Sequence, residues 1–424
     1  MINVLNGCQE KTRGNWPCTI FKVPENIRQC DNTAYDPSVV TIGPYHYNKS
    51  EDRTVQAMQA HKWHCVRRLL SRHTKSRRKA TDLFGQCLEE MRKMDADVRG
   101  SYSEDLHHLS VNDLALIMLL DGCFIIHVLL KFNEDKYWEN TSNMASLGKN
   151  NDNDDERLFS KLKTPGDEDI NVVKIARSLF IRIHPSPLQS LATDLPEQVH
   201  HLLHLFHSTF VPSADCLKIN SINSQKQNID VEWVEWVEWV PSATELQLAG
   251  VKFVEKKGSA TNFLDISFQN GTIEIPQIVL HAGTNTLFRN LTAFEQYYYP
   301  NIEGYVTAYL FFMDYMINAP KDVELFGLKG IFINKLCTPD RAATLINDLC
   351  HQIQDPANNY LQGSIQCVKN YYESKWHKWR ARLMRDYFDN PWAIVSLAAA
   401  LILLLLTAQQ SFFAVYSYFR PPKN

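Results

Sequence analysis

Four histidines lie close together near the middle of the chain and are the side chains best suited to metal chemistry. If one helix covers this segment, His200, His204 and His207 fall at i, i+4 and i+7, and one face could present three imidazoles to Zn²⁺. The first histidine is not followed by the Glu of an H-E-x-x-H pattern, and the sequence suggests no fourth ligand nearby. Packed or hydrogen-bonded histidines are therefore the favoured interpretation, and a zinc site is the alternative.

Other catalytic signatures are missing from the sequence. It contains no G-x-S-x-G, which would place a serine on a strained turn beside an oxyanion hole. It also contains neither G-x-x-x-x-G-K-[ST] nor G-x-G-x-x-G, the glycine-rich patterns whose backbone cradles phosphates. The acidic run Asp167-Glu-Asp169 lies in a Pro/Gly segment where carboxylates are simply solvated. We predict no enzymatic activity and no cofactor.

The end of the chain is apolar enough to cross a bilayer. No charged side chain occurs from Trp392 to Phe419, and a bilayer core needs about 20 apolar residues in a helix. We predict one transmembrane helix over 392–419, followed by a short tail at 420–424, so that the protein is tail-anchored and the lipid bilayer is its first partner. The residues chosen to represent the membrane segment are Trp392, Ala393, Leu403, Leu406, Phe412, Phe413 and Tyr416.

The charges beside this segment predict its orientation. Basic residues are retained on the cytoplasmic side of a membrane, and the preceding flank is much richer in them than the tail, which has only Arg420 and Lys423. The basic residues of that flank are Lys375, Lys378, Arg380, Arg382 and Arg385. The N-terminus also lacks the basic start and apolar run of a signal peptide. We therefore predict a cytosolic N-terminal domain on either the plasma membrane or an endomembrane.

A second apolar segment, 111–132, is long enough to compete as a membrane span. Asp121 lies at its middle, and a carboxylate at a bilayer centre costs about 2.5–3.5 kcal/mol. We therefore interpret this segment as a buried helix of the cytosolic domain.

Composition is that of an ordinary folded body ahead of the anchor. The chain is 45% hydrophobic and 21% charged, with a formal net charge of −3, so we predict no nucleic-acid partner. A basic run between Arg67 and Lys79 could bind nucleic acid, an import receptor or anionic lipid, but a solvated helix end is the favoured interpretation. The ten cysteines form no C-x-x-C pair, and reduced thiols are expected in the cytosol.

Periodicity along the chain predicts mainly helices. After an irregular N-terminus at 1–17 and several early prolines, helical spacing begins near Thr54 and returns at 82–99, 111–132, 187–210 and beyond Asn285. Alternating residues on either side of Asn270-Gly271 predict a β-hairpin, to which Val251–Val254 could add a strand. The predicted fold of 18–390 is mainly α with a small antiparallel β-hairpin or meander (α+β), followed by the C-terminal transmembrane helix.

Two polar stretches interrupt this pattern. The segment at about 140–170 is rich in Asn and Asp, and the segment at about 213–240 ends in the triplet repeat VEWVEWVEW. Three Trp at period three drift around a helix by about 60° per repeat and form no straight stripe. A tolerant loop is the favoured interpretation of the repeat, and an exposed aromatic contact surface is the alternative.

Short motifs in a fixed order resemble those of the plant "domain of unknown function 247" family, over roughly residues 18–419. The motifs are Phe21-Lys-Val-Pro24, Ala34-Tyr-Asp-Pro37, Thr41-Ile-Gly-Pro-Tyr-His46, Leu120-Asp-Gly-Cys-Phe124, His201-Leu-Leu-His-Leu205, Pro241-Ser-Ala-Thr-Glu-Leu246, Ala249-Gly-Val-Lys-Phe253, Asn270-Gly-Thr-Ile-Glu-Ile-Pro276, Arg289-Asn-Leu-Thr-Ala-Phe-Glu295, Lys321-Asp-Val-Glu-Leu325 and Tyr387-Phe-Asp-Asn-Pro-Trp392. The motif at Gly43–His46 is the most family-specific, with a structural role favoured over a binding surface. Two departures stand out: His127 occupies a position where the family usually has Glu, and the run Ile175–Pro185 does not align.

The resemblance implies a single-pass membrane protein of land plants without established enzymatic activity. Some grass members are associated with self-incompatibility loci, as candidate pollen-side recognition determinants. We therefore expect a membrane-anchored recognition or signalling protein whose helical domain binds a protein partner. A membrane-anchored enzyme of unrecognised type, and a diverged non-functional copy or a misplaced exon boundary, are the alternatives.

Overall fold

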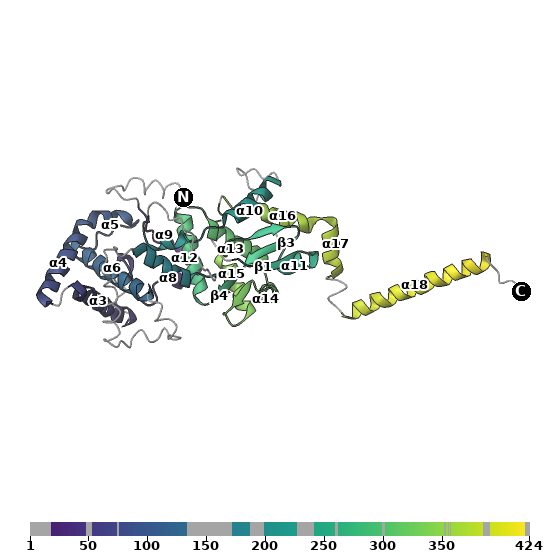
Figure 1. The fold of residues 1–424 in the computed structure, drawn as a ribbon, viewed down its shortest axis with the longest axis horizontal. Helices are drawn as coiled ribbons and strands as arrows, with labels where there is room; N and C mark the ends of the chain where they lie inside the picture. The colour runs from purple at the N-terminus through teal and green to yellow at the C-terminus, as the bar shows by residue number, and fades with distance from the viewer. Residues whose placement is uncertain are drawn as a thin grey trace. The chain divides into compact units, whose positions relative to one another are not determined.

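The computed structural model describes most of the chain between residues 18 and 419. The described residues are 18–47, 53–73, 76–133, 172–186, 199–226, 241–258, 262–298, 302–384 and 391–419, apart from positions 352, 355 and 357. The irregular N-terminus, the polar segment at 140–170, the triplet repeat, Arg385 and the tail at 420–424 lie outside them. Chain contacts divide the molecule into two compact units, which Figure 1 colours along the sequence.

The first unit, called the N-terminal unit, contains Met1–Val211, Gly283–Thr307 and His351–Gln354. Its helices are α2 (Glu25–Arg28), η1 (Asn32–Tyr35), η2 (Pro44–His46), α3 (Arg53–His73), α4 (Arg77–Lys93), α5 (Asp95–Ser101), α6 (Val111–Asn133), α8 (Val172–Ile183), α9 (Leu202–His207) and α12 (Gly283–Tyr298). The helix expected from Thr54 is therefore confirmed as α3. The unaligned run at 175–185 falls largely in α8, where Ala176 and Phe180 are buried.

The single helix expected at 82–99 is instead two helices that meet at Met94. Asp95 and Asp97 occupy the first turn of α5, where carboxylates stabilise a helix N-terminus. Arg99 then donates to the backbone oxygens of Leu106 and Leu109, which holds the chain that follows in a turn. The acidic start of α5 therefore accompanies the break at Met94, where the sequence has neither Pro nor Gly.

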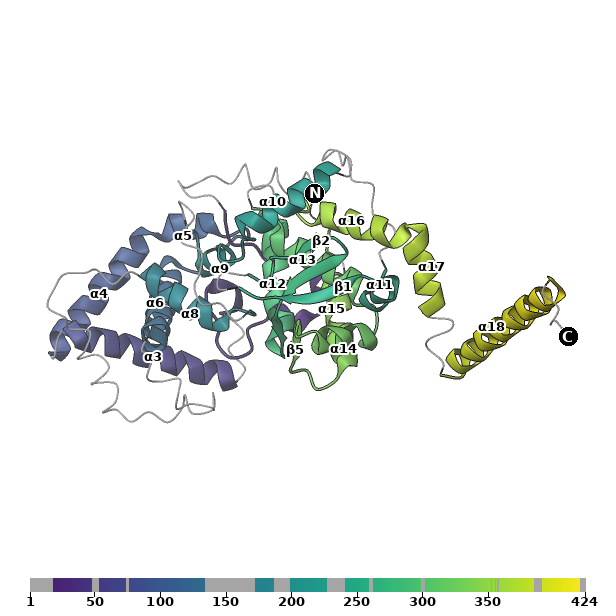
Figure 2. The same cartoon turned by 45° about the vertical axis from the view of Figure 1, so that its right-hand side comes forward.

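Helix α6 is the central helix of this group, and α3, α4 and α8 pack against it (Figure 2). The buried carboxylate of α6 has a partner of opposite charge: Asp121 forms an ion pair with Lys62 of α3. Both side chains are almost fully buried. Lys62 also donates to the Thr41 carbonyl at 2.5 Å, and Asp121 accepts the Gly43 N–H at 2.7 Å. The prediction that 111–132 is a buried helix is confirmed.

The second unit, called the C-terminal unit, contains Pro212–Ala282, Ala308–Cys350 and Asp355–Asn424. Its elements are α10 (Ala214–Lys226), α11 (Ala243–Ala249), β1 (Lys252–Lys256), β2 (Ser267–Gln269), β3 (Thr272–Pro276), β4 (Ile278–Leu280), α13 (Tyr305–Met316, from Ala308 onwards), α14 (Pro320–Leu328), β5 (Phe332–Asn334), α15 (Pro339–Leu349), α16 (Gln362–Glu373), α17 (Lys375–Leu383) and α18 (Pro391–Phe419). Helices α10 and α16 pack against each other and against β2, whereas α14 packs against β5.

The predicted hairpin is present, but the sheet around it is mixed. Strands β2 and β3 are antiparallel and are joined at Asn270 and Gly271, which both have positive φ, as a tight hairpin turn requires. Strand β1 pairs with β3 in parallel on its other edge, giving the order β1-β3-β2, so the expected antiparallel meander is wrong. A parallel pair needs a crossover connection, and here the crossover includes β2 itself and the buried turn around Asp265.

A second sheet, in which β4 pairs with β5 in parallel, was not predicted. Each of its strands has only three residues, too few to show a two-residue alternation in sequence. Helix α10 was also missed, because it lies in the polar stretch at 213–240. Its Asn220 and Asn223 are buried, and their side-chain amides donate to the Ile266 and Phe268 carbonyls, so polar composition there reflects packing against β2.

The Lys62–Asp121 pair yields a test of how the N-terminal unit is held together. Lys62→Met should cost about 3–5 kcal/mol of unfolding free energy, because it leaves a buried carboxylate without its partner. Adding Asp121→Leu should cost less than the sum of the single changes, with a coupling of about 1–3 kcal/mol. Urea unfolding of the full chain in detergent measures both.

The exposed Lys93–Glu90 pair is the matched control, since solvent screens an exposed ion pair and Lys93→Met should change the unfolding free energy little. Equal losses from Lys62→Met and Lys93→Met would contradict the assignment of Lys62 as a structural cation.

Candidate functional site

The four histidines do not form the zinc-binding face considered from the sequence. Helix α9 begins only at Leu202; His200 precedes it, and His201 is its N-cap, with Nδ1 accepting the His204 N–H at 3.1 Å. The rings of His200 and His204 are stacked 5.2 Å apart. Within the described part of the chain, no group of three or more His, Cys, Asp and Glu side chains is arranged to hold a metal. Packed and hydrogen-bonded histidines, the favoured interpretation, are what the structure shows.

His207 belongs to a buried polar cluster that positions a helix. Its Nε2 donates to Glu295 at 2.8 Å, and both side chains are almost fully buried. The same carboxylate accepts the N–H groups of Val306 and Thr307, at 2.9 and 2.8 Å, in the first turn of α13. The Glu295 carboxylate therefore caps the start of α13 and is held in place by His207.

Two further buried carboxylates act in the same way in the C-terminal unit. Asp322, only 1% exposed, accepts the N–H groups of Asn318 and Ala319 before α14 and that of Thr244 in α11. Asp265, fully buried, accepts N–H groups from Ser213 and Asn262. Asp322 and Thr244 lie in two separate family motifs. The Asp322 carboxylate therefore connects two segments of the chain that are 78 residues apart in sequence.

The Gly43–His46 motif also has a structural role. Gly43 has φ +76°, and a Cβ there would lie 3.0 Å from the Tyr102 hydroxyl, so only glycine fits without strain. Tyr45 packs edge-on against Tyr102 with ring centroids 5.1 Å apart, and its hydroxyl contacts the Ile20 carbonyl and the Ser103 hydroxyl, each at 3.3 Å. The motif's role as a binding surface receives no support from these contacts.

The basic flank ahead of the apolar segment forms α17, and its members differ in environment. Lys375, Lys378 and Arg382 are exposed, whereas the Arg380 guanidinium donates to the Leu248 carbonyl at 3.3 Å. His377 contacts the Ala249 carbonyl at 2.8 Å, so α17 docks on the C-terminal end of α11, where cations are stabilised. The indole rings of Trp376 and Trp379 lie 5.5 Å apart and are 65% and 54% exposed.

The predicted membrane segment is confirmed as one long apolar helix, α18. Its 29 residues extend for about 43 Å, more than the roughly 30 Å hydrocarbon core of a bilayer. Trp392 and Ala393 fall in its first turn. Leu403, Leu406, Phe412, Phe413 and Tyr416 are 48–64% exposed, and none of the residues in its apolar window is buried. Thr407 satisfies its hydroxyl within the helix by donating to the Leu403 carbonyl at 2.8 Å.

Both α6 and α18 are long and apolar enough to span a bilayer, but their environments differ. Half of the residues in the apolar window of α6 are buried in the protein, as in the core helix of a soluble domain. None of the residues in the apolar window of α18 is buried. Exposed apolar surface of this extent marks a binding or membrane-inserting element.

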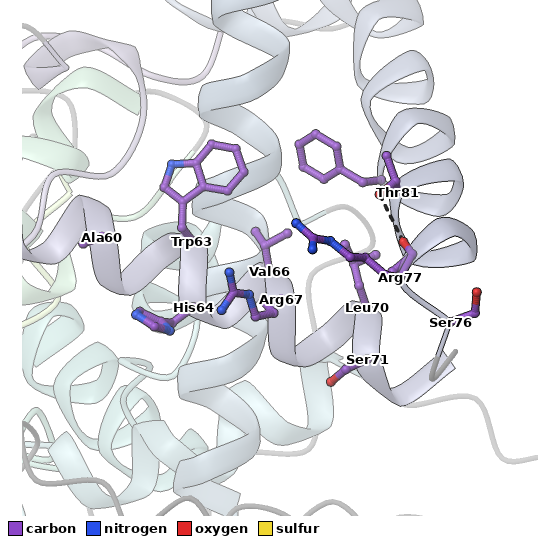
Figure 3. A pocket seen from close by; sticks show the side chains of 12 residues that line it. Ala60, Trp63, His64, Val66, Arg67, Leu70, Ser71, Ser76, Arg77 and Thr81 are labelled. Atoms are coloured by element: carbon purple, nitrogen blue, oxygen red, sulfur yellow. Dashed lines mark hydrogen bonds between the residues drawn. The ribbon is translucent and has the colours of Figure 1, made fainter.

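A pocket of about 780 Å³ lies between α3 and α4 in the N-terminal unit, and sequence analysis did not find it (Figure 3). It is lined by apolar residues Ala60, Trp63, Val66, Leu70, Ala80 and Phe84, by Arg67, Arg77 and His64, and by the hydroxyl residues Ser71, Ser76 and Thr81. Two members of the basic run, Arg67 and Arg77, therefore line the pocket while remaining exposed. The signal that could have revealed it is the spacing of Trp63 and Arg67 at i and i+4, which places both on one exposed side of α3.

Comparison with known proteins supports the resemblance noted in the sequence. A family model described as a plant protein of unknown function, DUF247, matches residues 20–406. The chain belongs to this family. It is 27% identical to the UPF0481 protein At3g47200 of Arabidopsis thaliana over 98% of this chain and 90% of that protein. It is 29% identical to the putative UPF0481 protein At3g02645 of the same plant over 42% of this chain and 34% of that protein. No solved structure matches this DUF247 member.

Two buried imidazoles make the stability of the N-terminal unit depend on pH. Burial lowers the pKa of His184 to about 4, against a smaller opposing effect of the Ser186 N–H. Burial also lowers the pKa of His201 to about 4, with the neighbouring His204 acting in the same direction. Because the unfolded chain binds these protons near pH 6.5, stability is complete above that value and is lost as the pH falls towards 4.

We therefore expect His184→Asn to flatten the fall in unfolding free energy between pH 6.5 and 4, by up to about 3 kcal/mol. Asn removes the titrating ring but keeps an acceptor for the Ser186 N–H, which donates to the His184 Nδ1 at 3.2 Å. Unfolding followed across this pH range measures the slope. His107→Asn, at an exposed histidine, is the control, and an equal slope change in both variants would contradict the assignment.

Proposed function

We propose that this DUF247 member is a single-pass membrane protein whose helical domain recognises a protein partner, without enzymatic activity. The observation that carries the proposal is α18, a 29-residue helix without charge whose described side chains are exposed. In water, this surface would be strongly unfavourable, since each fully exposed Leu or Phe forgoes about 1.5–3 kcal/mol of burial free energy. Insertion into a bilayer satisfies the helix because its backbone bonds are all internal.

Helix α17 supports an orientation as well as an anchor. This helix exposes three basic side chains, Lys375, Lys378 and Arg382, and the two indole rings of Trp376 and Trp379. Basic and aromatic side chains are both favoured at the membrane–water interface. This arrangement favours a cytosolic position for both compact units, on the plasma membrane or an endomembrane.

The buried polar groups support recognition rather than catalysis. Asp121, Asp265, Glu295 and Asp322 accept backbone N–H groups, and His207 donates to Glu295, so their bonding capacity serves the fold. Because some grass members of the family are associated with self-incompatibility loci, we propose cell recognition as the process in which this chain acts. The burial of Ala176 and Phe180 in α8 favours a functional copy over a degenerate one, because the unaligned run contributes to the packed interior.

Membrane anchoring is tested by alkaline extraction of membranes from cells that express the full chain. The wild-type protein should stay in the membrane pellet, whereas Leu403→Lys/Leu406→Lys should move largely to the supernatant. Each lysine near the centre of the span costs about 2.5–3.5 kcal/mol of insertion free energy. Val254→Lys/Leu328→Lys adds the same charge at exposed apolar positions outside α18 and should remain in the pellet.

Recovery of the wild-type chain in the alkaline supernatant would overturn the anchor. Protease protection of tags on both termini then reads orientation, with the N-terminal tag digested and the C-terminal tag protected. The recognition role requires that detergent-solubilised full chain captures a protein in stoichiometric amount. If the full chain captures no protein in stoichiometric amount, the recognition role is contradicted and the enzyme alternative is favoured.

A further inference from the structure

The pocket between α3 and α4 combines positive charge with apolar walls. Among the described residues that line it there is no Asp or Glu, while Arg67 and Arg77 contribute from opposite helices. In Figure 3 both arginine side chains extend into the space between the helices, beside Trp63 and Val66. The surrounding sequence has the same sign, because no acidic residue occurs between Thr54 and Thr81. The pocket therefore attracts anions.

Both arginine side chains of the pocket are exposed. Neither guanidinium forms an ion pair with the carboxylates of the described residues, in contrast to Arg92 and Arg99, which pair with Glu89 and Asp95. The small side chains of Ala60 and Ala80 leave the space between the helices open, and its size is in the range of small-molecule sites, about 300–1,000 Å³. Guanidinium groups bind phosphate and carboxylate oxygens through charge-assisted hydrogen bonds.

Half of the residues that line the pocket have apolar side chains. This composition favours an amphiphilic anion over a free inorganic anion. Trp63 is 46% exposed, and its ring lies 5.8 Å from that of Phe84, so two aromatic groups remain partly accessible at the pocket. A free phosphate would cover none of this apolar surface. An amphiphile covers it with hydrocarbon while its acidic group reaches Arg67 and Arg77.

We propose that this pocket binds one anionic phospholipid, with the headgroup phosphate at Arg67 and Arg77 and the upper acyl carbons against Trp63 and Phe84. The choice of a bilayer lipid rests on the proposed membrane anchoring, which supplies phospholipid at high local concentration. The pocket thus makes the N-terminal unit selective for the lipid composition of the membrane that carries it.

Native mass spectrometry of the full chain in a neutral detergent tests the proposal, with phosphatidic acid as the probe. The wild-type chain should bind one molecule in preference to phosphatidylcholine. Arg67→Gln/Arg77→Gln should weaken binding about a hundredfold, about tenfold for each arginine. Ala80→Phe should also weaken binding by filling the pocket while leaving its charge unchanged.

Arg78→Gln/Lys79→Gln is the matched control. It removes two exposed charges from α4, the helix of Arg77, at positions that do not line the pocket, and it should change the affinity for phosphatidic acid less than threefold. An equal loss in the control pair overturns the proposal in favour of general surface attraction. Inorganic phosphate that displaces the lipid at equal concentration overturns it in favour of a simple anion site. A phosphorylated peptide that displaces the lipid more strongly would assign the pocket to a protein ligand.

Lipid binding by the pocket can be tested separately from membrane anchoring by α18. Leu403→Lys/Leu406→Lys should still bind phosphatidic acid in detergent, whereas Arg67→Gln/Arg77→Gln should still stay in the membrane pellet after alkaline extraction. Loss of lipid from the first variant would place the lipid on α18 and overturn the pocket assignment.

Discussion

The described fold depends on buried carboxylates that accept backbone N–H groups from distant segments. A buried carboxylate is costly unless its oxygens are paired, so each one fixes the position of the chain that satisfies it. Asp121 fixes the Gly43 turn and Lys62, Glu295 fixes the start of α13, and Asp265 and Asp322 fix the starts of α10 and α11. Helices without a strong apolar stripe, such as α10, are thereby held in place by polar contacts.

This use of charge explains why several of the family's short motifs are informative about the fold. Asp121, Glu295 and Asp322 each lie within a motif, and their partners Gly43 and Thr244 lie in other motifs. Two of these contacts, Gly43 with Asp121 and Thr244 with Asp322, therefore each join two motifs that lie far apart in the sequence. Their chemistry resembles that of active sites because both require buried, ionisable groups, but here the hydrogen-bonding capacity is used by the backbone.

The surface features carry the functional argument instead. Helix α18 is apolar and exposed, and α17 before it presents exposed aromatic and basic groups; both observations support the membrane anchor proposed above. The pocket between α3 and α4 adds a second combination of arginine and apolar surface on a different unit. Both features would suit the amphiphilic ligands proposed above, and neither includes one of the buried carboxylates.

The sequence by itself determined the apolar C-terminal helix, α3, the core helix α6, the β2–β3 hairpin and the family, because each is encoded by local spacing or by ordered motifs. Tertiary structure alone decided the parallel pairing of β1, the short β4–β5 sheet and the helix in the polar stretch at 214–226, since these depend on contacts between distant residues. It also decided that His201 caps a helix and that Arg67 and Arg77 share a cavity. Local patterns record periodicity and charge, whereas the partner that satisfies a buried polar group is chosen only when the chain folds.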